Sequence, residues 1–211
     1  MKKRNVFFAV LLAMSVLITA CGANKQNLDG KWTGSMDLTK QFEDGIIAAY
    51  PDLEDYVDFK DLVLKMDIVF DEEQMSMEVK KESIEAFNVS FAEGMKTIAE
   101  DYWTAGLAEI DMTLEEAISE SGINEDEYLA RIYKETGIDK MITSMTEITN
   151  QTLDKISKMK GTYTTPLENE LRLYYTDTEY ESMEYSFKGK VLNIVIQGEN
   201  FSLHIACEKN K

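Results

Sequence analysis

The sequence is poor in the residues that build metal centres, disulfide frameworks and nucleic-acid sites. Its 211 residues include one histidine and two cysteines, and 22 basic residues stand against 39 acidic ones, a net charge of -17. So few ligands exclude an ordinary zinc cage, and two cysteines exclude a disulfide framework. The negative charge argues against binding to nucleic-acid phosphates. We therefore expect no metal, no cofactor and no nucleic-acid partner.

Long apolar runs are also missing. Residues 6–20 form an apolar segment of 15 residues, shorter than the roughly 20 residues of a membrane-spanning helix. The segment follows Lys2, Lys3 and Arg4, so residues 1–20 are predicted to be a cleaved signal peptide. Without them the chain keeps 19 basic and 39 acidic residues, and its net charge becomes -20.

The end of this segment, Ile18-Thr19-Ala20-Cys21, resembles the lipobox of bacterial lipoproteins, in which two small residues precede an obligatory cysteine. The resemblance implies diacylglycerol on the Cys21 thiol and a lipid-anchored protein on the extracytoplasmic face of a bacterial cell membrane. An ordinary signal peptide cut after Ala20 is the alternative. Residues 21–27 are then the lipidated cysteine and a short tether, and residues 28–208 are the folded body.

Apolar and polar residues alternate in eight segments of the body, which is the pattern of half-buried β-strands. The segments are residues 32–38, 62–70, 75–79, 159–165, 171–175, 183–187, 192–196 and 201–207. Most are joined by short turns. The pattern predicts an eight-stranded up-and-down antiparallel barrel.

Residues 83–157 follow a different period, with apolar residues every three or four positions, as in amphipathic helices. Helix boundaries are indicated by Thr113 with Glu116, by Gly122, by Asn124 and by Gly137, and Asp139 is expected to cap the last helix. A smaller helix is expected over residues 39–50. The fold class is therefore α+β, a mainly β core with a helical insertion between the third and fourth strands.

The segment Leu28-Asp29-Gly30-Lys31-Trp32-Thr33-Gly34 resembles the first strand of lipocalin and calycin barrels, which carries Gly-x-Trp, here Gly30 and Trp32. The hairpins at 185–192 and 197–203 are similar to those of lipocalin-like bacterial lipoproteins. The resemblance covers residues 28–38 and 159–208 and implies a lipocalin-like barrel. Lipocalins usually stack an arginine on the tryptophan, and Lys209 is expected to take that place here.

The interior of such a barrel is the first candidate site. Eight strands enclose a space just wide enough to be packed solid or to hold one small ligand. Its inward positions are rich in methionine, which suits irregular apolar surfaces. The candidate lining residues are Met36, Leu64, Met66, Met77, Tyr163, Leu173, Met183 and Tyr185.

Catalytic motifs are missing from the sequence. The single histidine, His204, alternates with Leu203 and Ile205 and should face outward, and no Gly-x-Ser-x-Gly motif is present. Cys207 is in phase with the buried face and is expected to be a small core residue. The acidic clusters do not match a calcium-binding loop and are expected to be solvated surface. We therefore expect a protein that is not an enzyme.

The order of the strands carries a further expectation. Connections in a meander alternate between the two ends of the barrel, so the helical connections at 39–59 and 83–157 should lie at one end, opposite Trp32 and the tether. Two functions remain open at this point. One is capture of a small hydrophobic ligand in the barrel, and the other is binding of a protein partner by the helical insertion over a solid barrel. A hydrolase is the third and weakest alternative.

Overall fold

The computed structural model describes residues 27–197 and 202–210 of the chain. Its strands are β1 Gly30–Asp37, β2 Val63–Asp71, β3 Gln74–Val79, β4 Lys160–Leu167, β5 Glu170–Tyr174, β6 Tyr180–Lys188, β7 Val191–Gln197 and β8 Ser202–Lys209. Each strand pairs antiparallel with its neighbours in the chain, and β1 also pairs with β8, which closes the barrel. The predicted eight-stranded antiparallel barrel is confirmed. The predicted signal peptide, Cys21 and Phe201 lie outside the described residues.

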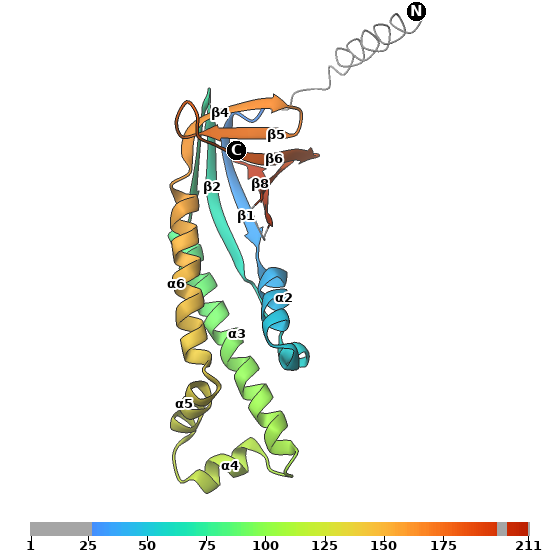
Figure 1. The fold of residues 1–211 in the computed structure, drawn as a ribbon, viewed down its shortest axis with the longest axis vertical. Helices are drawn as coiled ribbons and strands as arrows, with labels where there is room; N and C mark the ends of the chain where they lie inside the picture. The colour runs from blue at the N-terminus through green and yellow to red at the C-terminus, as the bar shows by residue number, and fades with distance from the viewer. Residues whose placement is uncertain (1–26, 198–201, 211) are drawn as a thin grey trace, which may run out of the picture.

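The helices occupy two connections of the barrel. The first, between β1 and β2, holds α2 Thr39–Ala49 and the 3-10 helix η1 Pro51–Tyr56. The second, between β3 and β4, holds α3 Lys81–Ala108, α4 Leu114–Ser121, α5 Glu125–Thr136 and α6 Ile138–Ser157. Both groups lie at the same end of the barrel (Figure 1). The expectation of one shared helical end is confirmed.

Most of the helix boundaries follow the expected signals. Thr113 and Glu116 form a capping box at the start of α4, and Gly122 ends that helix with φ 72°. The expectation for Asp139 is wrong. Gly137, with φ 75°, serves as C-cap of α5 and N-cap of α6, so Asp139 lies inside the first turn of α6. Because the left-handed Gly137 joins the two helices directly, no residue in an extended conformation stands between them whose side chain could act as the N-cap of α6.

The inward side chains of the strands form a continuous core. Of the candidate lining residues, Met36, Leu64, Met66, Met77, Leu173 and Met183 are at most 1% exposed. The other two, Tyr163 and Tyr185, are partly buried. At Gly34 there is no spare volume, because a Cβ there would lie 2.8 Å from Ile205 Cγ2 and 3.0 Å from Met66 Cγ. The barrel interior is therefore filled by side chains at this level.

The end of the barrel opposite the helices is organised around Trp32. Its indole Nε1 donates a hydrogen bond of 2.7 Å to the Leu28 carbonyl, and Phe187 packs 6.1 Å away. The Lys209 ammonium lies 5.3 Å from the Trp32 ring centroid, as expected. Gly30 has φ 120°, and a Cβ there would lie 2.9 Å from Lys209 Cε. The backbone conformation therefore requires glycine at position 30, whereas the flexible Lys209 side chain could move away from a Cβ.

Candidate functional site

The longest helix, α3, reaches well beyond the barrel. Its 28 residues correspond to a length of about 42 Å. The first half contacts β2, and its buried residues include Phe87, Phe91 and Met95. The second half projects away from the barrel in Figure 1 and can pack only against other helices. Here Tyr102 is 44% exposed, and Ile110, which follows the end of α3 at Ala108, is 66% exposed. The apolar stripe of α3 is thus longer than the surface that covers it.

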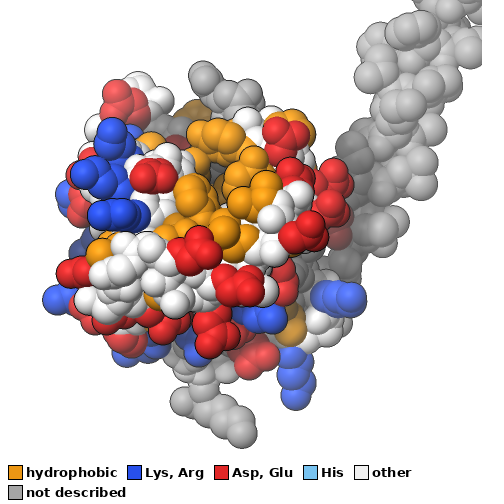
Figure 2. All heavy atoms as spheres, turned by 90° about the horizontal axis from the view of Figure 1, so that it is seen from below, with side chains coloured by type: hydrophobic (Ala, Val, Ile, Leu, Met, Phe, Trp, Pro, Cys, Tyr) orange, Lys and Arg blue, Asp and Glu red, His pale blue; other side chains and the backbone are white. Residues whose placement is uncertain are grey.

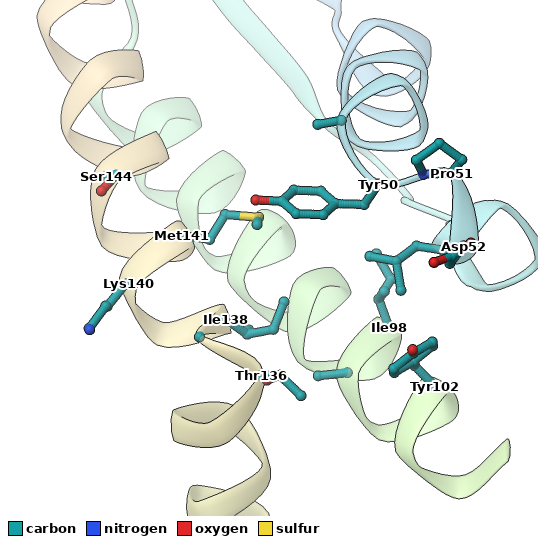
Figure 3. Close-up of a pocket in the computed structure, with 14 residues that line it drawn as sticks. Tyr50, Pro51, Asp52, Ile98, Tyr102, Thr136, Ile138, Lys140, Met141 and Ser144 are labelled. Carbon is teal, nitrogen blue, oxygen red and sulfur yellow. The ribbon is translucent and has the colours of Figure 1, made fainter. Parts of the chain in front are cut away.

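A groove of about 660 Å³ lies along the second half of α3 (Figure 3). Its floor is α3, one wall is the junction of α2 with η1, and the other is the junction of α5 with α6. The lining residues are Ala49, Tyr50, Pro51, Asp52, Leu53, Ile98, Ala99, Tyr102, Thr136, Gly137, Ile138, Lys140, Met141 and Ser144. Its volume falls within the 300–1,000 Å³ typical of ligand sites.

The groove is apolar in its depth and open to water along one side. Ile98 and Ala99 are nearly fully buried in the floor, whereas Tyr50 is 48% exposed at the rim. Figure 3 shows the Tyr50 ring projecting from its wall across the groove toward Met141 on α6. An occupant would therefore stay exposed to water along one side.

A second cavity of about 370 Å³ continues the groove along α3. It is lined by Tyr56, Tyr102, Trp103, Ala105, Gly106, Leu107 and Glu109. Tyr102 belongs to both cavities. A Cβ at Gly106 would meet no atom within 4 Å, so this part of the groove is empty. From Ile98 to Glu109 the two cavities follow α3 for about 16 Å.

Aromatic contacts fix the η1 wall to α3. The Phe59 ring stacks on Phe91 with centroids 5.6 Å apart, and the Tyr56 ring meets Tyr102 edge-on at 5.8 Å. Gly94 makes room for the first pair, since a Cβ there would lie 2.5 Å from Phe59 Cδ1. Both contacts therefore hold the C-terminal end of η1 against α3.

The opposite wall is attached to α3 through Tyr133 of α5. Its hydroxyl donates a hydrogen bond to the Glu100 carboxylate, and the Lys96 ammonium lies 5.4 Å from the ring centroid. Burial and this hydrogen bond raise the pKa of Tyr133, so the hydroxyl keeps its proton. Ile138, at the start of α6, is 4% exposed and fixes the corner of the wall.

The charges around the groove are unevenly distributed. Asp52, Glu54 and Asp55 of η1 are exposed, and none of them forms an ion pair within the described part of the chain. The one basic lining residue, Lys140, points away from the groove in Figure 3. Figure 2 views the helical end of the molecule, where an apolar, hollowed centre is bordered by acidic side chains over much of its rim. The η1 wall therefore presents uncompensated negative charge.

The sequence-predicted site residues lie elsewhere. The barrel candidates, Gly30 and Trp32 do not line the groove. His204 is exposed, with its Nε2 3.2 Å from Ser202 Oγ, and Cys207 is fully buried, as expected for both. Burial raises the pKa of the Cys207 thiol to about 12. In residues 27–197 and 202–210, no group of three histidine, cysteine or acidic residues is placed to hold a metal ion.

Two further observations bear on the class of protein. No helix among the described residues combines the length and the apolarity that crossing a bilayer requires. Comparison with protein-family models, with curated proteins and with solved structures gives no match for the chain. The function is therefore inferred from this chain's own residues and geometry.

Proposed function

We propose that this protein is a lipid-anchored extracytoplasmic lipoprotein of bacterial type that binds a partner in the groove between its helices. In this proposal the lipocalin-like barrel is a packed scaffold, and the helices carry the site. One observation carries it: the groove of about 660 Å³ lies among the helices, whereas the barrel has no room for even a methyl group at Gly34. A ligand within the barrel stays an untested prediction, which this packing disfavours.

The lipobox-like segment and the shared helical end together support an orientation for the protein. A lipid on Cys21 and a tether of six residues, 22–27, would hold the folded body, which starts at Leu28 just before β1, within about 20–25 Å of the membrane. The β1 strand begins at the end of the barrel opposite the helices (Figure 1). The groove would then face away from the membrane, where a partner can reach it.

A count of reactive thiols tests the anchor. Cys207 should be silent toward a disulfide reagent near pH 8 in the folded protein, because the thiolate is the reactive species and burial holds the Cys207 thiol neutral. In guanidinium, protein purified from membranes should expose one thiol, since lipid occupies Cys21. Two thiols in the unfolded protein would contradict lipidation. The Cys207→Ala variant is the control and should then expose none.

Photo-crosslinking in intact cells tests the groove. A benzophenone amino acid at Ser144, which lines the groove, should give a covalent adduct of defined mass. The same group at Thr143 is the matched control, because Thr143 is also exposed on α6 but lies outside the lining. Successive helix positions point about 100° apart, so only one of the two faces the occupant. Equal adducts at both positions, or none at Ser144, would contradict the proposal.

A further inference from the structure

We propose that the occupant of the groove is a cationic amphipathic helix of a partner protein. This inference rests on the proposed function, because it names the partner of the same site. Three independent features of the groove lead to it: its length, its open side and the charge of its η1 wall.

The first feature is the shape of the groove. The two cavities share Tyr102 and follow α3 from Ile98 to Glu109, a distance of about 16 Å, or three turns of a helix. Gly106 leaves the floor of the second cavity open. A helix laid along α3 could place apolar side chains at successive turns into both cavities, as helix-in-groove complexes do.

The second feature is the solvent exposure of one side. Tyr50 and Tyr102 line the groove while remaining 48% and 44% exposed. A wholly apolar occupant such as an acyl chain would keep much of its surface in water. An amphipathic helix needs cover on one face only, because its polar face is stable in water. The open groove therefore suits a helix better than a lipid.

The third feature is charge. Asp52 of η1 lines the groove, and Glu54 and Asp55 lie on the same short helix. None of the three has an ion-pair partner in the described residues, and Lys140 points away from the groove. Basic residues on the polar face of a bound helix would meet this wall. A second copy of the chain is a poor occupant, since each copy carries a net charge of -20 after loss of residues 1–20 and like charges repel.

The test uses full-length protein in phosphatidylcholine nanodiscs, with empty nanodiscs as the blank. The probes are two fluorescent helical peptides of about 12 residues, one of leucine and lysine and one of leucine and glutamate with the same apolar face. Anisotropy should show binding of the lysine peptide and at least about tenfold weaker binding of the glutamate peptide. Binding of the lysine peptide should weaken as the salt concentration rises from about 0.1 M to about 1 M, because the added salt shortens the screening length from about 10 Å to about 3 Å.

Two pairs of variants locate the binding. The triple variant Asp52→Asn, Glu54→Gln, Asp55→Asn should weaken binding of the lysine peptide at least about fivefold. Its matched control neutralises three acidic residues around the β2–β3 turn at the other end of the barrel, namely Asp71, Glu72 and Glu73. Gly106→Leu should block the groove, whereas Gly45→Leu on α2, equally free of neighbours within 4 Å, should not.

The outcomes separate this inference from the proposed function. Equal weakening by both triple variants would mean a general charge effect and would overturn the inference. Equal binding of the two peptides, blocked by Gly106→Leu, would overturn the choice of a cationic partner while leaving the groove as the binding site. If neither peptide binds but the Ser144 crosslinker still gives a specific adduct, the helical partner is wrong and groove binding stands. Failure of both experiments would overturn both proposals.

Discussion

Replacing Phe91 by alanine is expected to lower the free energy of unfolding by about 3–5 kcal/mol. Phe91 is 1% exposed in the middle of the aromatic cluster between α2, α3 and the end of η1. Its ring stacks on Phe59 at 5.6 Å with an interplanar angle of 18°, and it meets Phe42 edge-on at 5.2 Å. The variant would lose the buried ring, leave a cavity and break both pairs. Equilibrium denaturation followed by circular dichroism measures the loss.

The controls for this prediction distinguish a lost ring from a general disturbance of α3. Phe91→Leu keeps most of the volume and should cost under about 1.5 kcal/mol. Ala105→Gly, in the part of α3 that lies beyond the barrel, should cost only the helix propensity of about 1 kcal/mol. A loss below about 1 kcal/mol for Phe91→Ala would mean that the cluster does not hold the helices on the barrel. Since typical domains are stable by only 5–15 kcal/mol, the expected loss is a large fraction of the whole.

The same cluster connects stability to the proposed site. Phe59 follows η1 in the chain, and its backbone N–H donates a hydrogen bond of 3.1 Å to Glu43 on α2. Phe59 therefore fixes one end of the wall that carries Asp52, Glu54 and Asp55. Phe91→Ala should therefore weaken binding in the groove as well as lower the stability of the fold, even though Phe91 does not line the groove.

Local sequence patterns predicted the elements of the fold well, for a physical reason. Strand alternation follows from side chains pointing to opposite faces of a sheet, so the buried and exposed positions of β2, such as Leu64 and Lys65, could be assigned directly. The parity of a meander then placed both helical connections at one end. The position of Lys209 over Trp32 followed from a family resemblance. The first two inferences depend on a short stretch of chain or on strand order alone.

The boundary at Asp139 shows how a local pattern can mislead. An aspartate before an apolar periodic segment is a typical N-cap, but Gly137 already turns the chain into α6 with φ 75°. Gly137 as a helix stop and Asp139 as a helix start are both visible within three residues of the sequence. The deciding factor was the direct connection of α5 to α6, which only the packing of these helices against α3 determines.

The groove could not be predicted in this way because no local pattern defines it. Its floor and walls come from residues 49–53, 98–102 and 136–144, which are far apart in the chain. Their residue types are those of ordinary helix surfaces. One signal was available: α3 continues its apolar period for more turns than the end of a small barrel can cover. The sequence also could not predict whether side chains fill the barrel interior, because alternation indicates which side chains point inward but not how much space they enclose.

The second large effect is expected at Gly161, where the helical insertion rejoins the barrel. A Cβ at this position would lie 2.0 Å from the Tyr174 carbonyl oxygen and 2.9 Å from its carbon. Both atoms belong to the backbone of β5, which is hydrogen-bonded to β4 and β6, so neither can rotate away as a side chain could. Gly161→Ala should therefore separate β4 from β5 and cost about 3 kcal/mol or more.

An opposite result is expected at Gly106, which makes it the matched control. A Cβ there meets nothing within 4 Å, and alanine is favoured over glycine inside a helix by about 1 kcal/mol. Denaturation curves should thus shift toward lower stability for Gly161→Ala and toward higher stability for Gly106→Ala. A change within about 0.5 kcal/mol of wild type for Gly161→Ala would contradict the close approach of the strands.

The position of Gly161 extends this prediction to the groove. Just before it, the Met77 N–H donates to the Met159 carbonyl at 2.9 Å, and the Val79 N–H donates to Ser157 Oγ at 3.2 Å. These bonds join the end of α6 to β3. Because only two residues separate the end of α6 at Ser157 from the start of β4 at Lys160, a displaced β4 would strain these bonds and displace the helix that carries Met141 and Ser144. Gly161→Ala should accordingly reduce crosslinking at Ser144 under conditions in which the barrel remains folded.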